Sequence, residues 1–254
     1  MFTHQRQQLL LDHLAEQGSA SVAALAARFG VSDDTIRRDL RALAGQGVLQ
    51  QTHGGAIALD VPRMDRQPRA RILGAVKQRL ALAVAAAVRP GQTLMLDAGM
   101  TLLAVARALP EVPLTVITHS LDLANALCDR PRIRLVLAGG EWDARQRLFG
   151  GASAARAVAE HRADLAILGA CAVHPELGVT ASGAADAEVK RAMLACAAQA
   201  WLVADHTKFG AHQPCFVGPL DAFHRLFTDR PVSFATPRPA VTVAAGSAKE
   251  QHHD

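Results

Sequence analysis

Residues 93–101 have the sequence TLMLDAGMT, in which a short apolar run leads through a small-residue turn into a helix-forming segment. The apolar run ends at Asp97, the turn contains Gly99, and an apolar helical pattern covers residues 102–109. A buried strand that leads directly into a helix is typical of parallel sheets that are covered by helices on both faces. This stretch therefore predicts an α/β fold.

The same succession of strand, turn and helix recurs along the second part of the chain. Further strands are predicted at residues 114–118, 133–138, 165–168 and 201–204, and further helices at residues 121–128 and 187–198. We therefore expect a mostly parallel α/β domain over residues 77–235. Residues 236–254 are rich in Pro, Ala and polar residues, so we expect a C-terminal tail in which only residues 241–243 have the pattern of a core segment.

Residues 1–59 have a different pattern, with three short helices followed by a glycine-marked hairpin. The predicted elements are a helix over residues 5–17, two helices with the N-caps Ser21 and Ser32, and strands over residues 48–52 and 56–59 joined through His53, Gly54 and Gly55. This order is typical of a winged helix-turn-helix domain that binds DNA, with the helix-turn-helix at about residues 20–39.

The third predicted helix separates apolar from basic side chains. At about 100° per residue, its apolar residues share one side and its arginines the other: Ile36, Leu40 and Leu43 against Arg37, Arg38 and Arg41. Arginine binds guanine edges or phosphates, and Ser32 and Thr35 at the helix start can also reach DNA. An ordinary solvated face is the alternative interpretation, but the adjoining hairpin and basic segment favour a recognition helix. Asp34 is expected to pair with Arg37 or Arg38.

The excess positive charge of the chain is confined to a short segment. Residues 61–80 have a net charge of +5, whereas residues 1–60 have −1 and the remaining residues are balanced. The segment contains Pro62 and Pro68 and shows no regular periodicity before about residue 72. We therefore predict a basic linker over residues 60–76, whose charge attracts phosphate without sequence preference.

The composition argues against several other classes of protein. The longest apolar run, residues 80–88, is too short to span a membrane, and the polar N-terminus does not resemble a signal peptide, so a cytoplasmic protein is expected. The four cysteines are far apart in the sequence, which favours reduced, buried thiols. None of the eleven histidines forms a His-x-x-x-His pair, and we predict no metal and no cofactor. Trp142 and Trp201 are interpreted as core or partly buried residues.

The turns that follow the predicted strands of the second domain are candidates for a ligand site. The carboxyl ends of parallel strands meet at one edge of a sheet, where free N–H groups at helix starts favour anions. Phosphate is predicted to lie against Gly99, Met100, Thr101 and Ser120. Asp97 is predicted to accept hydrogen bonds from sugar hydroxyls, and Lys208 to add positive charge. Each of these residues, taken singly, is also common in ordinary turns and caps.

Both parts of the chain resemble the DeoR family of bacterial transcriptional regulators. In the first part the resemblance lies in VSDDTIRRDL at residues 31–40 and THGGA at residues 52–56. In the second part it lies in DAGMT, ITHS, LAGG, AEVK and ADHTKFG, at residues 97–101, 117–120, 137–140, 187–190 and 204–210. The chain departs from the family pattern at Gln50 and Gln51, where the wing usually carries an arginine, and at Met100 and His119, where threonine and asparagine are common.

The resemblance implies a sensor domain with a fold like that of ribose-5-phosphate isomerase. It adds Thr118, His119, Gly139, Gly140 and Glu188 to the effector site, and it implies DNA contacts from Ser32, Thr35, Arg37, Arg38, Arg41, His53, Gly54 and Gly55. It also implies a repressor of a sugar or carbohydrate operon, which a phosphorylated sugar or related intermediate releases from double-stranded operator DNA. Paired half-sites in such DNA imply a homo-oligomer.

A sugar-phosphate isomerase fused to a DNA-binding domain is the alternative. Such chemistry needs a carboxylate base close to the bound sugar, for which Asp97 and Glu188 are candidates. The strand-end segment GACAVH, at residues 169–174, lacks the acidic residues expected of these isomerases. The DNA-binding domain favours a sensor, so we expect no enzymatic activity.

The uneven distribution of charge predicts how affinity for DNA depends on salt. Binding that rests on phosphate contacts weakens as the salt concentration rises, because counterions are released from DNA. Neutralising the basic residues between positions 63 and 79 is therefore expected to flatten the slope of log affinity against log salt. An unchanged slope, measured by titration of labelled DNA at several salt concentrations, would show that this charge is ordinary solvated surface.

Overall fold

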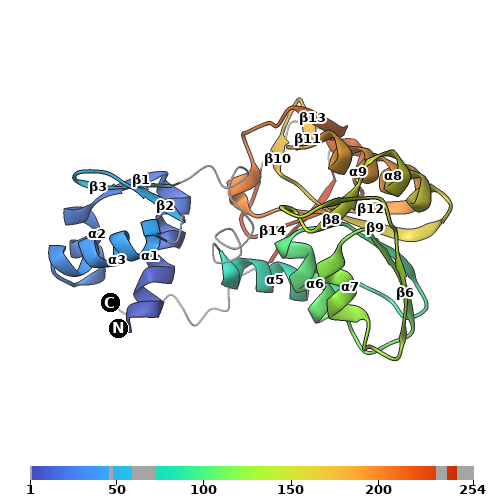
Figure 1. The fold of residues 1–254 in the computed structure, drawn as a ribbon, viewed down its shortest axis with the longest axis horizontal. Coiled ribbons are helices and arrows are strands. Elements are labelled where there is room, and N and C mark those ends of the chain that lie inside the picture. The colour runs from blue at the N-terminus through green and yellow to red at the C-terminus, as the bar shows by residue number, and fades with distance from the viewer. Residues whose placement is uncertain (1, 46–47, 59–72, 233–238, 245–254) are drawn as a thin grey trace. The chain divides into compact units, whose positions relative to one another are not determined.

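The computed structural model describes residues 2–45, 48–58, 73–232 and 239–244 (Figure 1). The chain divides into two compact units, Met1–Gly74 and Ala75–Asp254. Most of the predicted basic linker, residues 60–72, lies outside the described residues. Among the described residues, no helix is both long and apolar enough to cross a membrane.

The first unit contains three helices and a three-stranded antiparallel sheet. The helices are α1 (Thr3–Gln17), α2 (Val22–Phe29) and α3 (Asp33–Gly45), and the strands are β1 (Ser19–Ser21), β2 (Leu49–Gln51) and β3 (Gly55–Ala58). The sheet has the order β1-β3-β2. The predicted helices and hairpin are thus confirmed, and β1 is an additional strand that the sequence analysis did not anticipate.

Local contacts explain where these elements begin and end. The Ser21 Oγ accepts a hydrogen bond from the backbone N–H of Ala24, and the Ser32 Oγ accepts one from Thr35, so both serines cap helices as predicted. Gly30 ends α2 in the left-handed conformation, at φ 64°. A Cβ atom on Gly55 would lie 2.1 Å from the carbonyl oxygen of Ala20, so β1 and β3 can pair only with glycine there.

A buried ion pair links α1 to α3. The Arg6 Nε lies 2.5 Å from Asp39 Oδ2, and the side chains of Arg6 and Asp39 are only 10% and 3% exposed. The side-chain amide of Gln7 donates to the other Asp39 oxygen at 3.1 Å. Around this pair, Leu10, Ile36 and Leu40 are fully buried. The apolar face of the third helix therefore packs inward, as its periodicity predicted.

The second unit is built on a seven-stranded parallel sheet with the order β15-β14-β12-β9-β4-β5-β6. Its strands are β4 (Thr93–Leu96), β5 (Leu114–Thr118), β6 (Ile133–Leu137), β9 (Ala163–Gly169), β12 (Ala197–Val203), β14 (Arg225–Thr228) and β15 (Ala240–Val243). The predicted parallel α/β fold is confirmed. The segment expected to be a tail contributes the edge strand β15, which pairs with β14.

Helices cover both faces of this sheet (Figure 1). One face packs against α5 (Gly74–Ala85), α6 (Met100–Ala108) and α7 (Leu121–Leu127), and the other against α8 (Gly151–Ala159) and α9 (Ala184–Cys196). Side chains alternate between the faces along each strand, so Leu94 and Leu96 join the first core while Met95 joins the second. This double coverage explains why the strands were recognisable as continuous apolar runs.

Smaller elements surround the sheet and were not predicted. They are the hairpin of β7 (Glu141–Asp143) and β8 (Leu148–Gly150), the side sheet of β10 (Ala172–His174), β11 (Gly178–Ala181) and β13 (Cys215–Gly218), and the short helices η2 (His206–Lys208) and η3 (Leu220–Ala222). Trp201 is buried as expected, but Trp142 is 40% exposed and packs on Phe149 in the hairpin. Cys128 is exposed, contrary to the expectation of buried thiols.

Replacement of Asp39 by asparagine is expected to destabilise the first unit by about 3 kcal/mol, because it removes the buried carboxylate that pairs with the Arg6 guanidinium. Hydrogen exchange of the α1 and α3 amides in the full-length chain measures this loss as a lower free energy of opening. The matched control is Asp33→Asn on the same helix, since Asp33 is half exposed and its loss should change stability by less than about 0.5 kcal/mol. Equal effects of the two substitutions on the free energy of opening would contradict the stabilising role given to the buried Arg6–Asp39 pair.

Candidate functional site

The exposed face of α3 carries the residues predicted to contact DNA. Arg37, Arg38 and Arg41 are all exposed, while the opposite face of the helix is buried. The ion pair on this face joins Arg37 to Asp33, at 3.9 Å, rather than to Asp34 as the sequence analysis favoured. Both partners of this pair are about half exposed, so it contributes little energy and leaves the guanidinium free to rearrange. Three exposed guanidinium groups on a helix whose opposite, apolar face is buried in the domain core suit contact with DNA.

The predicted wing residues divide into exposed and structural positions. His53 and Gly54 lie exposed in the turn between β2 and β3, where a side chain or backbone N–H can reach a phosphate. Gly55 is buried in β3 against β1, so its role is to allow the sheet to form. Ser32 and Thr35 are joined by their hydroxyls at 2.9 Å at the start of α3. Direct DNA contact by any of these residues stays a prediction.

The predicted effector residues gather at the carboxyl ends of the sheet strands. Asp97 directly follows β4, His119 follows β5, and the Gly139–Gly140 pair follows β6. Gly99 is the N-cap of α6, and Met100 and Thr101 form its first turn, half-buried. This arrangement presents the first backbone N–H groups of α6 at the predicted edge.

Several of the predicted effector residues have structural roles at this edge. The Ser120 Oγ accepts a hydrogen bond from the backbone N–H of Leu123 and so caps α7, while Thr118 Oγ1 accepts from Ser120. Thr118 and Ser120 are both buried. A Cβ atom on Gly140 would lie 2.7 Å from that of Ala154, so this glycine allows close packing against α8. These structural contacts explain the presence of Thr118, Ser120 and Gly140 at this edge without a bound ligand.

A cluster of four buried side chains, Asp97, His119, Asp186 and Lys190, lies behind this edge; we call it the buried cluster. Asp97 Oδ2 accepts hydrogen bonds from Lys190 Nζ and from the backbone N–H of Gly169, the latter at 2.9 Å. Lys190 Nζ also lies 3.5 Å from Asp186 Oδ1. All four residues are less than 5% exposed. The cluster therefore joins β4, β5 and α9 through charged and polar groups.

Charge interactions within the buried cluster shift the pKa values of two of its members. Burial lowers the pKa of the Lys190 ammonium, but the carboxylates of Asp186 and Asp97 outweigh burial and raise this pKa above its ordinary value. Burial raises the pKa of the Asp186 carboxyl, whereas Lys190 and His119 lower it, and the net shift is downward. Asp186 and Lys190 are therefore held as an ion pair.

Sequence analysis missed Asp186 and Lys190 and selected Glu188 between them. Glu188 is half-buried and lies on another side of α9, because two helical residues differ by about 200°. The spacing of Asp186 and Lys190 by four residues was the available signal, since it places both on one helix face. Such pairs are so common on exposed helices that the spacing alone does not reveal burial.

Lys208, which was predicted to add positive charge to the effector site, is not bonded to the buried cluster in the described structure. It is half-buried at the end of η2, and within the described structure no hydrogen bond or ion pair links its ammonium group to Asp97 or His119. Asp205 caps η2 by accepting from the backbone N–H of Thr207 at 3.1 Å. A half-exposed cation at the carboxyl end of β12 is compatible with an anionic ligand, and this role stays a prediction.

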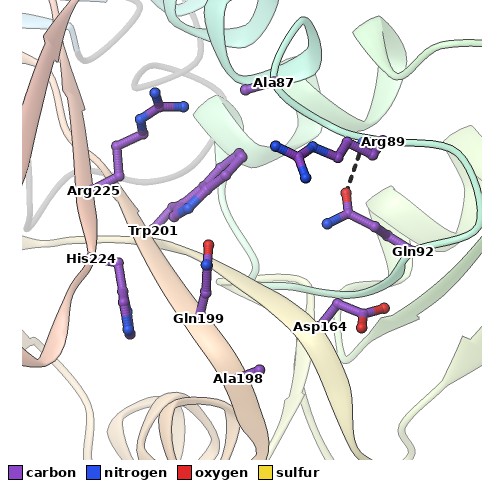
Figure 2. A pocket seen from close by; sticks show the side chains of 9 residues that line it. All are labelled: Ala87, Arg89, Gln92, Asp164, Ala198, Gln199, Trp201, His224 and Arg225. Carbon is purple, nitrogen blue, oxygen red and sulfur yellow. Dashed lines mark hydrogen bonds between the residues drawn. The ribbon is translucent and has the colours of Figure 1, made fainter.

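A pocket of about 540 Å³ lies at the opposite edge of the sheet, at the amino ends of the strands (Figure 2). It is lined by Ala87, Arg89, Gln92, Asp164, Ala198, Gln199, Trp201, His224 and Arg225. The Arg225 guanidinium stacks on the Trp201 ring, at 5.5 Å from its centroid, and the Gln92 side chain accepts from the backbone of Arg89. None of the predicted effector residues lines this pocket. The pocket is a second candidate site for an anionic ligand, besides the carboxyl edge, because Arg89 and Arg225 both line it.

Comparison with known proteins identifies both units. Residues 6–61 match the DeoR-like helix-turn-helix domain, and residues 74–230 match the DeoR C terminal sensor domain. The glycerol-3-phosphate regulon repressor of Escherichia coli (strain K12) is 32% identical over 232 residues, covering 89% of this chain and 91% of the relative. The HTH-type transcriptional repressor GlcR of Bacillus subtilis (strain 168) is 31% identical, covering 91% and 90%.

Among solved structures, ribose 5-phosphate isomerase A from Methanocaldococcus jannaschii is 17% identical, with a TM-score of 0.41 over 54% of each chain. This likeness says nothing about activity. The two domain matches cover both described units, and the matched repressors align over nine-tenths of their length. The chain therefore belongs to the DeoR family of bacterial transcriptional regulators.

Proposed function

We propose that this regulator is a cytoplasmic repressor of a sugar or carbohydrate operon, released from double-stranded operator DNA by a phosphorylated sugar or a related intermediate. The observation that carries the proposal is the pairing, in one chain, of an exposed arginine face on α3 with an α/β sensor domain. The matched relatives support it, since both are repressors and one is named for the glycerol-3-phosphate regulon.

Operator recognition is proposed to rest on the direction of the arginines rather than on total charge. The first 60 residues carry a net charge of −1, so the domain as a whole does not attract DNA. Arg37, Arg38 and Arg41 nevertheless project from one helix, α3. The buried Arg6–Asp39 pair holds this helix against α1. A helix held in this way can place guanidinium groups at base edges in the major groove.

The effector is proposed to bind at the carboxyl edge, with its phosphate at the start of α6 and near Lys208. Free backbone N–H groups of the first helical turn and the helix dipole favour an anion there. Met100 in this turn offers no hydroxyl, so backbone groups and Thr101 are left to hold the phosphate. Glu188, Gly139 and Gly140 are retained as candidate contacts to the sugar.

Release from DNA is proposed to follow a shift between two arrangements of a homo-oligomer. An effector that binds one arrangement more tightly increases its population, and recognition helices that no longer match paired half-sites lose affinity. Paired half-sites require at least two DNA-binding domains, which is the reason for proposing more than one copy.

A sugar-phosphate isomerase activity is the less favoured function. Such catalysis needs a carboxylate that can take a proton from the sugar. One oxygen of Asp97, Oδ2, already accepts hydrogen bonds from Lys190 Nζ and from the backbone N–H of Gly169, and the Asp97 side chain is fully buried, which does not suit it to take a proton from a bound sugar. We therefore propose no enzymatic activity, and isomerisation of pentose or hexose phosphates by the purified protein would favour the alternative.

Substitution of Arg37 or Arg38 by alanine is expected to weaken operator binding about tenfold or more, since a bidentate contact to a base is worth about 1–3 kcal/mol. The measurement is fluorescence anisotropy with an operator selected by the full-length protein from random double-stranded DNA. Arg107→Ala, an exposed arginine of the sensor domain, is the control and should bind normally. Unchanged affinity in both α3 variants would remove α3 from operator recognition, while sugar-phosphate binding should persist in all variants.

Lys208→Ala is expected to weaken effector binding about tenfold, because a hydrogen bond to a charged group contributes about 1.5–3 kcal/mol. A thermal-shift screen of sugar phosphates first identifies the effector, whose binding raises the melting temperature of the native protein. Arg89→Ala then distinguishes the two edges of the sheet, since Arg89 lines the opposite pocket. Loss of the shift in Arg89→Ala with a normal shift in Lys208→Ala would place the effector in that pocket instead.

A further inference from the structure

Three atoms of the buried cluster face one another without hydrogen-bond partners. They are Asp97 Oδ1, Asp186 Oδ1 and His119 Nε2. The His119 side chain is fully buried, and its other ring nitrogen is also without a hydrogen bond. Buried polar atoms are normally hydrogen-bonded, because leaving one without a partner costs about 1–3 kcal/mol. An unsatisfied histidine directed at two unsatisfied carboxylate oxygens indicates that another species binds among them.

The charge of the cluster indicates that this species is a cation. Asp97 and Asp186 supply two buried carboxylates and Lys190 one ammonium group that contacts both of them, so carboxylates outnumber ammonium groups among the side chains of the cluster. A buried charge without compensation costs several kcal/mol. Lys190 approaches Asp97 through Oδ2, which leaves Oδ1 free on the side of His119. The two carboxylate oxygens that accept no hydrogen bond, Asp97 Oδ1 and Asp186 Oδ1, therefore both lie on the side of His119 Nε2.

The distances among these atoms suit metal coordination better than direct hydrogen bonds. His119 Nε2 lies 3.8 Å from Asp97 Oδ1 and 3.7 Å from Asp186 Oδ1, and the three donor atoms are within 4.8 Å of one another. These separations exceed a hydrogen bond between nitrogen and oxygen. Two ligands of one tetrahedral ion, each about 2.0–2.2 Å from it, lie about 3.4 Å apart. Small side-chain movements would bring all three atoms to a common centre.

We propose that Asp97, His119 and Asp186 bind one divalent transition-metal ion of the Zn²⁺ class. One imidazole nitrogen and two carboxylate oxygens are suitable ligands for such an ion, and a neutral imidazole is the usual nitrogen donor. Three protein ligands leave a fourth position of a tetrahedral ion open for water or another oxygen ligand. The proposal departs from the expectation from sequence that the chain binds no metal, and it does not rest on the identity of the effector.

The ligands escaped sequence analysis because they come from three separate elements. Asp97 follows β4, His119 follows β5, and Asp186 lies in the first turn of α9. Only the parallel sheet and the covering helix bring these positions together. A search for paired histidines on one helix therefore could not find the site.

Titration of full-length, chelator-treated protein with Co²⁺ and Zn²⁺ tests the proposal. One equivalent of Co²⁺ is expected to give the visible absorption of a four-coordinate ion, and Zn²⁺ should displace it and raise the melting temperature. In His119→Asn and in Asp186→Asn, affinity should fall at least about tenfold, since even outer partners of metal ligands change affinity by that factor. The Co²⁺ absorption should be lost in the same variants.

Two further variants test whether the ion binds at these three residues and not elsewhere on the domain. His212→Asn removes an exposed histidine of the same domain and should retain the full stoichiometry and spectrum. Lys190→Gln removes the neighbouring positive charge, so it should bind the ion more tightly if it keeps a native circular dichroism spectrum. Wild-type protein that binds no Co²⁺, or that binds it equally well in His119→Asn, Asp186→Asn and His212→Asn, would overturn the proposal. Sugar-phosphate binding by metal-free protein is a separate measurement, so failure of one proposal does not decide the other.

Discussion

The buried carboxylate of Asp97 is the constraint on which the carboxyl edge of the sensor domain depends. It accepts from Gly169, which is 72 residues away at the end of β9, and from Lys190, which is 93 residues away in α9. A carboxylate in such a place is tolerated only when donors meet it, because the cost of removing it from water is several kcal/mol. The ends of β4 and β9 and the face of α9 therefore have fixed relative positions.

A buried ion pair also joins separate segments of the DNA-binding domain, where Arg6 and Asp39 are buried together between α1 and α3. In both domains the ion pair joins distant segments, while the surface nearby carries the groups proposed to bind ligands. Buried ion pairs add little net stability compared with apolar packing, but removing one partner is costly. Their consequence here is a fixed orientation of exposed groups: the arginines of α3 in one domain, and the helix start of α6 in the other.

The elements that the sequence predicted well are those in which a local pattern and the final environment agree. The strand β5 and the serine caps of α2 and α3 follow from apolar runs and hydroxyl spacing that burial and hydrogen bonding then satisfy. The strands β10, β11 and β13 have three or four residues each, too short for a clear apolar pattern, and β11 also pairs with β13, which lies far along the sequence. Asp186 and Lys190 were missed for a related reason, because their pattern is that of a solvated helix pair and only the tertiary fold buries it.

His119 shows how one side chain can change the chemistry of an otherwise ordinary strand end. An amide at this position would offer both a donor and an acceptor to its neighbours, whereas a neutral imidazole offers one of each on opposite sides of a rigid ring. With two carboxylate oxygens on the same side, a ring nitrogen that presents its lone pair to them cannot hydrogen-bond to either one, since all three atoms are then acceptors. The cluster is satisfied only if a proton or a cation stands between them. Because this requirement lies directly behind the strand ends, whatever meets it also sets the charge that an anionic ligand at the carboxyl edge experiences.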